Sequence, residues 1–272
     1  MKKIRAFISD ICKKNKFIRI IARKCLYIYE GLKYSKYYYK YKLDDKVILF
    51  EAFNGRNYTC SPKAIYEKMI TMDEFQDYKM IWAFMDPEKH EVAPFHNLEV
   101  VKSKSKEYYK YCSMAKYWII NSLMEEGVKK KKGQLYIQCW HGTPLKKLRC
   151  DIEVNGASLN TAKEIRKRND IDAKRFDYFI SPSKYCTEKF TSAFNLKNLG
   201  KENIIIEEGY PRNDFLFHKT KKDIDAIKKK LGVPLDKKVL FYMPTFRDNQ
   251  HTSGVGYTYK LAIDFDRLKK KF

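Results

Sequence analysis

Residues 138–147, with the sequence QCWHGTPLKK, bring together side chains that could act on a phosphate ester. They follow an apolar run, residues 135–137, that is typical of a strand. Such a strand would place the imidazole of His141 at the carboxyl edge of a sheet, where open α/β folds bind their ligands. Gly142 would let a ligand approach the backbone closely. A single histidine near a strand end is more often structural than catalytic, so its role depends on the residues around it.

The residues after His141 predict the start of a helix. Thr143 can cap such a helix, and Pro144 suits its first turn. The free amide groups at that helix start, with Lys146 and Lys147 close by, would favour a phosphate.

The charge of the chain is the strongest signal in its composition. It has 56 Lys and Arg residues against 33 Asp and Glu, a formal net charge of +23. Such a surface attracts nucleic acid, anionic lipid or a phosphate-rich substrate, and charge alone does not choose among them. No RNP1, KH, zinc-finger or helix-turn-helix pattern is present, so we expect no nucleic acid partner.

The seven cysteines are scattered and form no C-x-x-C pair. This pattern indicates free thiols in a reducing compartment and disfavours a zinc site. Three D-x-D sequences occur, but none follows a strongly apolar strand, so we predict no metal site and no cofactor.

From Lys46 onward, short apolar runs alternate with helical stretches, which predicts an α/β fold with a doubly wound parallel sheet. The predicted strands are Val47–Phe50, Met80–Phe84, Leu98–Val101, Tyr117–Asn121, Leu135–Gln138, Tyr178–Ser181 and Ile204–Glu207. The predicted helices include Pro62–Ile70, Ser105–Met114 and Ser183–Phe194. A further polar helical stretch, Ala157–Lys174, could bind acceptor phosphates through Arg166, Lys167 and Arg168, or be a solvated helix.

Residues 1–43 carry thirteen Lys and Arg side chains, with apolar residues near one face at helical spacing. This pattern predicts a basic amphipathic helix. The helix could lie on an anionic membrane surface or pack on the domain behind it with a solvated basic face. No segment approaches 18 uninterrupted apolar residues, and the N-terminus lacks the pattern of a signal peptide.

Near the C-terminus, Lys219–Lys230 is typical of a polar helix and Val239–Met243 of a new strand. Pro244, Thr245 and Arg247 would then lie in the loop at the carboxyl end of that strand. One strand and a short tail would not form a second doubly wound domain.

Four motifs occur in the order found in one enzyme family. They are FEAFNGR at 50–56 with SPKAIY at 61–66, then WHGTPLKK at 140–147, GYPRND at 209–214 and YMPTFRD at 242–248. Together they resemble the CDP-glycerol:poly(glycerophosphate) glycerophosphotransferases, the polymerases and primases that build teichoic acid. The resemblance covers roughly residues 46 to 250.

The resemblance implies a GT-B-like fold, in which two Rossmann-like domains face a cleft. Here we expect one such domain and only the start of the second, preceded by the basic N-terminal helix. The expected domains are a membrane-association helix at 1–43, an acceptor-side domain at 44–215, and a linker helix with an incomplete donor domain at 216–272. The chain thus resembles the front part of an enzyme, truncated at its C-terminus.

The resemblance also implies the chemistry. His141 would take the proton from the terminal hydroxyl of the growing chain as that oxygen attacks the β-phosphorus of CDP-glycerol or CDP-ribitol, and CMP would leave. Expected donor contacts come from Gly142, Thr143, Pro144, Leu145, Arg212, Pro244, Thr245 and Arg247.

The acceptor would be a lipid-linked polyol phosphate, and the protein would be peripheral on the cytoplasmic face of the bacterial membrane. The alternative is an incomplete fragment that retains only acceptor and membrane binding. The sequence does not distinguish glycerol from ribitol donors or polymerase from primase, and it does not indicate the oligomeric state.

Overall fold

A computed structural model describes residues 15–153, 161–243, 251–252, 256–257 and 263–270. The chain divides into two compact units, Met1–His218 and Lys219–Phe272. The first unit contains the predicted sheet and the loop after β5 (Leu135–Gln138) that carries His141, so the site is built within this unit.

A seven-stranded parallel sheet with the order β3-β2-β1-β4-β5-β6-β7 forms the centre of the first unit. Its strands are β1 (Asp44–Glu51), β2 (Lys79–Phe84), β3 (Leu98–Lys102), β4 (Ala115–Ile120), β5 (Leu135–Gln138), β6 (Tyr178–Ser181) and β7 (Ile205–Glu207). The chain order reverses between β1 and β4, as in a doubly wound fold. All seven predicted strands are confirmed within three residues at each end.

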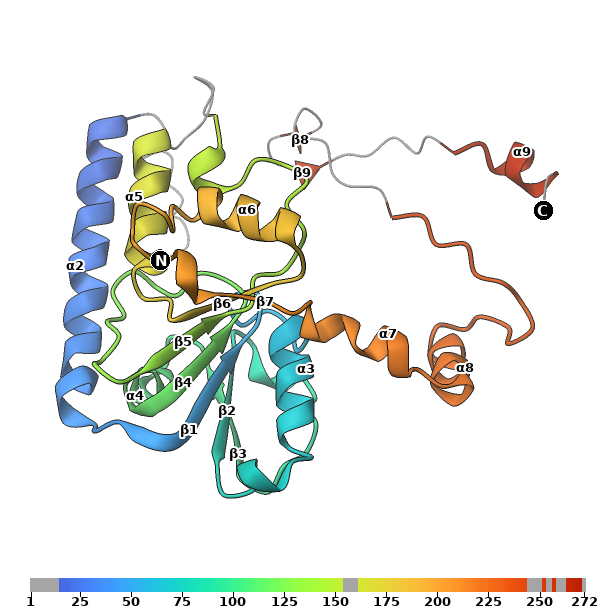
Figure 1. The fold of residues 1–272 in the computed structure, drawn as a ribbon, viewed down its shortest axis with the longest axis horizontal. Helices are drawn as coiled ribbons and strands as arrows, with labels where there is room; N and C mark the ends of the chain where they lie inside the picture. The colour runs from blue at the N-terminus through green and yellow to red at the C-terminus, as the bar shows by residue number, and fades with distance from the viewer. Residues whose placement is uncertain (1–14, 154–160, 244–250, 253–255, 258–262, 271–272) are drawn as a thin grey trace. The chain divides into compact units, whose positions relative to one another are not determined.

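Helices cover both faces of this sheet. They are α2 (Lys16–Lys40), α3 (Cys60–Met69), α4 (Lys106–Met114), α5 (Ala162–Ala173) and α6 (Lys184–Ala193). The exposed helix α7 (Phe215–His218) ends the unit and covers neither face. Short 3-10 turns are η1 (Asp73–Phe75), η2 (Pro87–Lys89), η3 (Arg149–Asp151), η4 (Glu202–Ile204) and η5 (Pro211–Asn213). In Figure 1, α3 lies on the opposite face of the sheet from α4.

Alternate residues of each strand enter two separate cores. Val47 and Leu49 of β1 pack with Tyr108 of α4, whereas Ile48 and Phe50 pack with Tyr66 of α3. Both faces of the strand are therefore buried, which explains why the sequence shows continuous apolar runs rather than alternation.

The helix α2 corresponds to the predicted N-terminal helix, and the side chain of Asn15 caps it. Tyr34 and Tyr37 are buried against the ring of Tyr109 on α4. Farther toward its N-terminus, α2 runs beside α5, and Arg23 donates a 3.1 Å hydrogen bond to Glu164. Packing on the domain is thus observed, and the residues before Asn15 lie outside the described part.

The outward side of α2 remains apolar. Phe17, Ile21, Tyr29 and Leu32 are all exposed, with 71% of Phe17 and 67% of Leu32 accessible to solvent. No helix within the described residues is long and apolar enough to cross a membrane. The helix α2 therefore has one packed side and one apolar side without a partner in the described structure.

The described part of the second unit contains two helices, α8 (Lys221–Lys230) and α9 (Phe265–Lys269). It also contains two short strands, β8 (His251–Thr252) and β9 (Gly256–Tyr257), which pair with each other. The helix predicted at Lys219–Lys230 is confirmed. The strand predicted at Val239–Met243 is wrong, because those residues pair with no strand in the described structure and expose 45–77% of their surfaces. An apolar run becomes a strand only when a neighbouring strand satisfies its backbone groups.

Candidate active site

Three loops meet at the carboxyl edge of the sheet, one after each of the neighbouring strands β1, β4 and β5. The side-chain oxygen of Asn121, after β4, accepts a hydrogen bond from the backbone N–H of Phe53 at 2.8 Å. The Ser122 hydroxyl accepts one from the N–H of Asn54 at 3.0 Å. The backbone carbonyl of Asn121 lies 2.7 Å from Nδ1 of His141. The structure therefore places His141 at the predicted edge and holds its ring there.

The hydrogen bond to Asn121 determines the tautomer of His141. A carbonyl oxygen can only accept, so Nδ1 carries the proton and Nε2 keeps its lone pair. Burial lowers the pKa of His141 below its ordinary value of 6.5, and the charges of Arg149 and Arg212 act in the same direction, while the Asn121 carbonyl opposes them. The imidazole is therefore neutral near pH 7 and can accept a proton at Nε2, as a general base must.

Aromatic rings and strained backbone surround His141. Its ring centroid lies 4.0 Å from that of Trp140 and 5.3 Å from that of Phe53. Phe53, Asn54, Trp140 and Arg149 have φ angles of 50°, 56°, 44° and 43°, in the left-handed region. A left-handed backbone conformation costs on the order of 1–3 kcal/mol for a residue other than glycine, and such strain concentrates at functional sites. The backbone around His141 is thus held in a conformation that local preferences alone would not select.

Arg212, the predicted donor-site arginine, lies next to His141. Its Nη1 donates to the His141 carbonyl at 2.6 Å and to the Cys60 sulfur at 3.3 Å. The guanidinium also lies over the Tyr210 ring, with Cζ 4.5 Å from the centroid. The fold therefore brings together His141 and Arg212, which are 71 positions apart in the chain. Both of these hydrogen bonds come from the same guanidinium nitrogen, Nη1.

The segment after His141 differs from its prediction. Residues 143–148 form no helix, so neither the cap at Thr143 nor the helical amide groups are present. Leu145 is 87% exposed, and an isolated turn with no buried apolar side has little to stabilise it. The carbonyl of Pro144 instead accepts from the Tyr185 hydroxyl at 2.9 Å.

Other predicted donor residues can be placed only in part. A Cβ added at Gly142 would meet no heavy atom of the described residues within 4 Å, so the backbone there faces open space. Pro244, Thr245 and Arg247 lie outside the described residues. Among the residues that the structure describes, no group of three His, Cys, Asp or Glu side chains could hold a metal ion.

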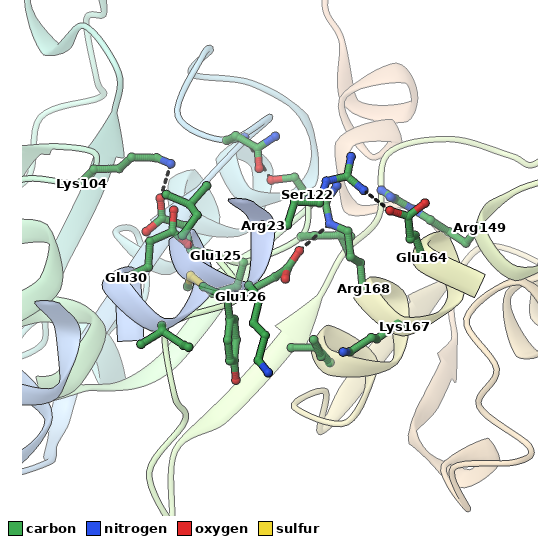
Figure 2. Close-up of a pocket in the computed structure, with 18 of the residues that line it drawn as sticks. Arg23, Glu30, Lys104, Ser122, Glu125, Glu126, Arg149, Glu164, Lys167 and Arg168 are labelled. Atoms are coloured by element: carbon green, nitrogen blue, oxygen red, sulfur yellow. Dashed lines mark hydrogen bonds and ion pairs between the residues drawn. The ribbon is translucent and has the colours of Figure 1, made fainter. Parts of the chain in front are cut away.

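A cavity of about 1100 Å³ opens beside His141. Its lining comes from α2, α5, the loop between β4 and β5, and the residues that follow β1, β3 and β5. Within the described structure, seven Lys or Arg and four Glu side chains line it. Figure 2 shows two groups of charges: Arg23, Arg149, Glu164 and Arg168 on one side, and Lys104, Glu30 and Glu125 on the other.

A buried ion pair supports the loop between β4 and β5. Arg175 pairs with Asp172 and donates to the backbone carbonyls of Met124, Glu125 and Val128. Because these carbonyls have no strand partners, the guanidinium supplies the hydrogen bonds that a buried loop requires. The loop that lines the cavity is therefore rigidly attached to the domain.

Sequence reasoning missed two residues of this site. Asn121 could have been found, because it ends a predicted strand at the same edge as His141. Arg149 carries no local signal, since its position depends on the path of the loop between His141 and η3.

The comparisons with known proteins identify the family of this chain. Residues 33–272 match the family described as CDP-Glycerol:Poly(glycerophosphate) glycerophosphotransferase. The chain belongs to this glycerophosphotransferase family. The resemblance seen in the four sequence motifs is thereby confirmed.

Relatives in this family are enzymes of teichoic acid synthesis. The chain is 41% identical over 228 residues to the teichoic acid poly(glycerol phosphate) polymerase of Staphylococcus epidermidis, covering 83% of this chain and 30% of that protein. It is 34% identical over 229 residues to the polymerase of Bacillus spizizenii, covering 84% of this chain and 57% of that protein. The chain thus spans less than two thirds of these relatives.

A solved structure extends the similarity to the fold. The wall teichoic acid polymerase TagF, in a variant soaked with CDPG, matches with a TM-score of 0.78 and 37% identity. The match covers 96% of this chain and 62% of that one. The predicted α/β fold of this family, with a doubly wound sheet behind an N-terminal helix, is therefore confirmed.

Proposed function

We propose that this chain carries the acceptor side of an enzyme that transfers glycerol phosphate from CDP-glycerol to a lipid-linked polyol-phosphate acceptor, releasing CMP. The geometry of His141 is the observation that carries the proposal. Family membership supports the transfer of glycerol phosphate, and a relative soaked with CDPG supports the donor. CDP-ribitol is the other donor that the same chemistry would accept.

The proposed step needs one base and charge neutralisation. His141 Nε2 accepts the proton of the acceptor's terminal hydroxyl as that oxygen bonds to the β-phosphorus. The bond from this phosphorus to the bridging oxygen breaks, and CMP leaves with the electron pair. Arg212, beside the His141 carbonyl, is placed to neutralise charge on the donor phosphates. Gly142, Thr143, Pro144 and Leu145 extend from His141 and are proposed to contact the donor.

Membrane association is part of the proposal. The exposed apolar residues of α2 form a stripe at helical spacing, and the same helix carries Arg and Lys side chains. Such a helix can insert its apolar side at a bilayer surface while its cations meet anionic headgroups, each adding about 1 kcal/mol. The proposed site of action is the cytoplasmic face of the membrane, where the lipid-linked acceptor would lie.

The test is CMP release by this chain joined to the donor-binding part of the Staphylococcus epidermidis relative. We expect His141→Gln to lower turnover about 10²- to 10⁴-fold, since glutamine keeps a hydrogen bond but cannot serve as the base. His96→Gln is the matched control, because His96 is exposed and precedes β3, at the opposite edge of the sheet.

The outcomes separate the two candidate functions. Near-normal turnover in His141→Gln would refute the role of His141 as base. The unmodified 272-residue chain is assayed alongside: binding of acceptor and membrane without CMP release would favour the binding-only alternative for this chain.

A further inference from the structure

Arg149 is a cation of the cavity that the proposed reaction has not yet used. It is half-buried, and its guanidinium carbon lies 5.3 Å from the centroid of Trp140, the ring that also packs against His141. Both Arg149 and His141 line the same cavity. The backbone of Arg149 is held at a φ of 43°, so the side chain is directed there at a conformational cost.

Three of the four carboxylates that line the cavity are engaged in ion pairs with other cations, and the fourth, Glu30, lies with Lys104 in the other group of charges. Glu164 pairs with Arg19 and Arg23, Glu126 pairs with Arg168, and Glu125 pairs with Lys104. Arg149 forms no ion pair with a carboxylate of the described residues. Burial lowers the pKa of its guanidinium, which means that its charge is poorly solvated. A cation in this position is expected to be balanced by an anion from outside the protein.

The cavity extends from His141 along α2 rather than toward the donor-side arginine. Its lining reaches Glu30 and Lys104, whereas Arg212 does not line it and contacts His141 only through the backbone carbonyl. The wall formed by α2 belongs to the helix whose outward side is exposed and apolar. A chain that is anchored in a membrane would therefore enter along this helix and end at His141.

We propose that Arg149 binds a phosphodiester of the polyol-phosphate acceptor, in the cavity that leads to His141. The inference rests on the proposed function and names one residue of its acceptor site. Arginine suits this role because its planar guanidinium can hold two phosphate oxygens at once. Lys167 and Arg168 of α5 line the same cavity, whereas Arg166 of the same helix does not.

The experiment measures binding to the full 272-residue chain by calorimetry. The probes are a synthetic phosphodiester-linked glycerol phosphate trimer, CDP-glycerol, and phosphatidylglycerol vesicles. The variant is Arg149→Gly, which removes the guanidinium and tolerates a positive φ. Arg166→Gln is the matched control, an exposed arginine outside the cavity. Thermal unfolding of each variant establishes that it is folded. A further variant, Arg149→Lys, keeps the positive charge but lacks the planar guanidinium group.

We expect Arg149→Gly to weaken trimer binding about ten- to hundredfold, the size of one lost hydrogen-bonded charge contact. Arg149→Lys should lie between it and the wild type. CDP-glycerol and vesicles should bind all variants equally, and Arg166→Gln should bind the trimer normally.

Unchanged trimer affinity in Arg149→Gly would overturn the inference, as would no trimer binding by the wild type. If Arg149→Gly lost affinity only for CDP-glycerol, Arg149 would belong to the donor site. If it lost affinity only for vesicles, Arg149 would bind lipid headgroups. Either result would overturn the assignment to the acceptor. Failure of the CMP-release assay with intact, Arg149-dependent trimer binding would refute the transferase function alone.

Discussion

Glu51 is a buried carboxyl group whose ionisation should weaken the fold next to the active site. It ends β1 and is only 4% exposed, two residues before the strained Phe53. The pKa of Glu51 is raised from 4.5 to about 7, mainly because the carboxyl group is buried. The charge of Glu125 contributes to this rise, whereas the hydrogen bond with Tyr108 and the charge of Lys104 oppose it. Near neutral pH the protein therefore contains a carboxyl group that is partly ionised in an apolar setting.

The sign of the effect on stability follows from the shift. The folded-state pKa lies above the unfolded value of 4.5. The contribution of Glu51 to stability is therefore fully present below pH 4.5, declines as the pH rises, and is lost above about pH 7. The shift from 4.5 to about 7 corresponds to a loss of about 3 kcal/mol in the free energy of unfolding, at 1.36 kcal/mol per pH unit.

The substitution Glu51→Gln removes this titration at nearly constant size. The free energy of unfolding of the variant minus that of the wild type should rise by about 2–3 kcal/mol between about pH 5 and pH 8. Urea unfolding followed by tryptophan fluorescence measures it, because Trp82, Trp118 and Trp140 are all buried in the first unit.

The exposed Glu107 on α4 provides the control, and Glu107→Gln should show a difference that does not vary with pH. If the difference for Glu51→Gln were equally flat, the ionisation of Glu51 would not be linked to folding, and the reasoning from its burial would be refuted.

Three further predictions concern His141, α2 and Gly55. Because burial lowers the pKa of His141 below 6.5, the acidic limb of the kcat/KM profile of the joined enzyme should lie below pH 6.5, and a limb above it would contradict the role of His141. Replacing Phe17 and Leu32 with Ser should release the chain from phosphatidylglycerol vesicles in a sedimentation assay, and unchanged sedimentation would exclude α2 as the anchor. Gly55→Ala should lower the free energy of unfolding by about 2 kcal/mol or more, since its Cβ would lie 2.5 Å from Oγ of Ser103 at a φ of 75°. The control Gly200→Ala, with a φ of 64° and open space around its Cβ, should cost less in the same urea titration.

The sheet could be predicted because each strand is an apolar run buried on both faces. The boundaries Leu135–Gln138 and Tyr178–Ser181 coincide with β5 and β6, and turn or capping residues bound most of the others. Only the ends differ: β1 begins at Asp44 rather than Val47, because its backbone pairs with a neighbour beyond the apolar residues. In the interior of the sheet, the apolar runs in the sequence and the backbone pairing therefore define the same strands.

The two elements that were wrongly predicted lacked a packing partner. Residues 143–148 have helix-starting chemistry at Thr143 and Pro144, but Leu145 finds no core to pack against. Val239–Met243 has strand composition without a neighbouring strand in the described residues. In both, a local preference worth a fraction of a kcal/mol per residue was not reinforced by burial.

For the site, the sequence by itself determined the chemistry that is available, and the tertiary structure decided how it is used. The strand before His141 and the parallel topology are enough to put an imidazole at the carboxyl edge. Which nitrogen holds the proton depends on the Asn121 carbonyl, which follows a different strand. The approach of Arg149 to the same cavity depends on a loop held in the left-handed region. Both features depend on how separate segments pack together, so no local pattern encodes them and only the folded structure decides them.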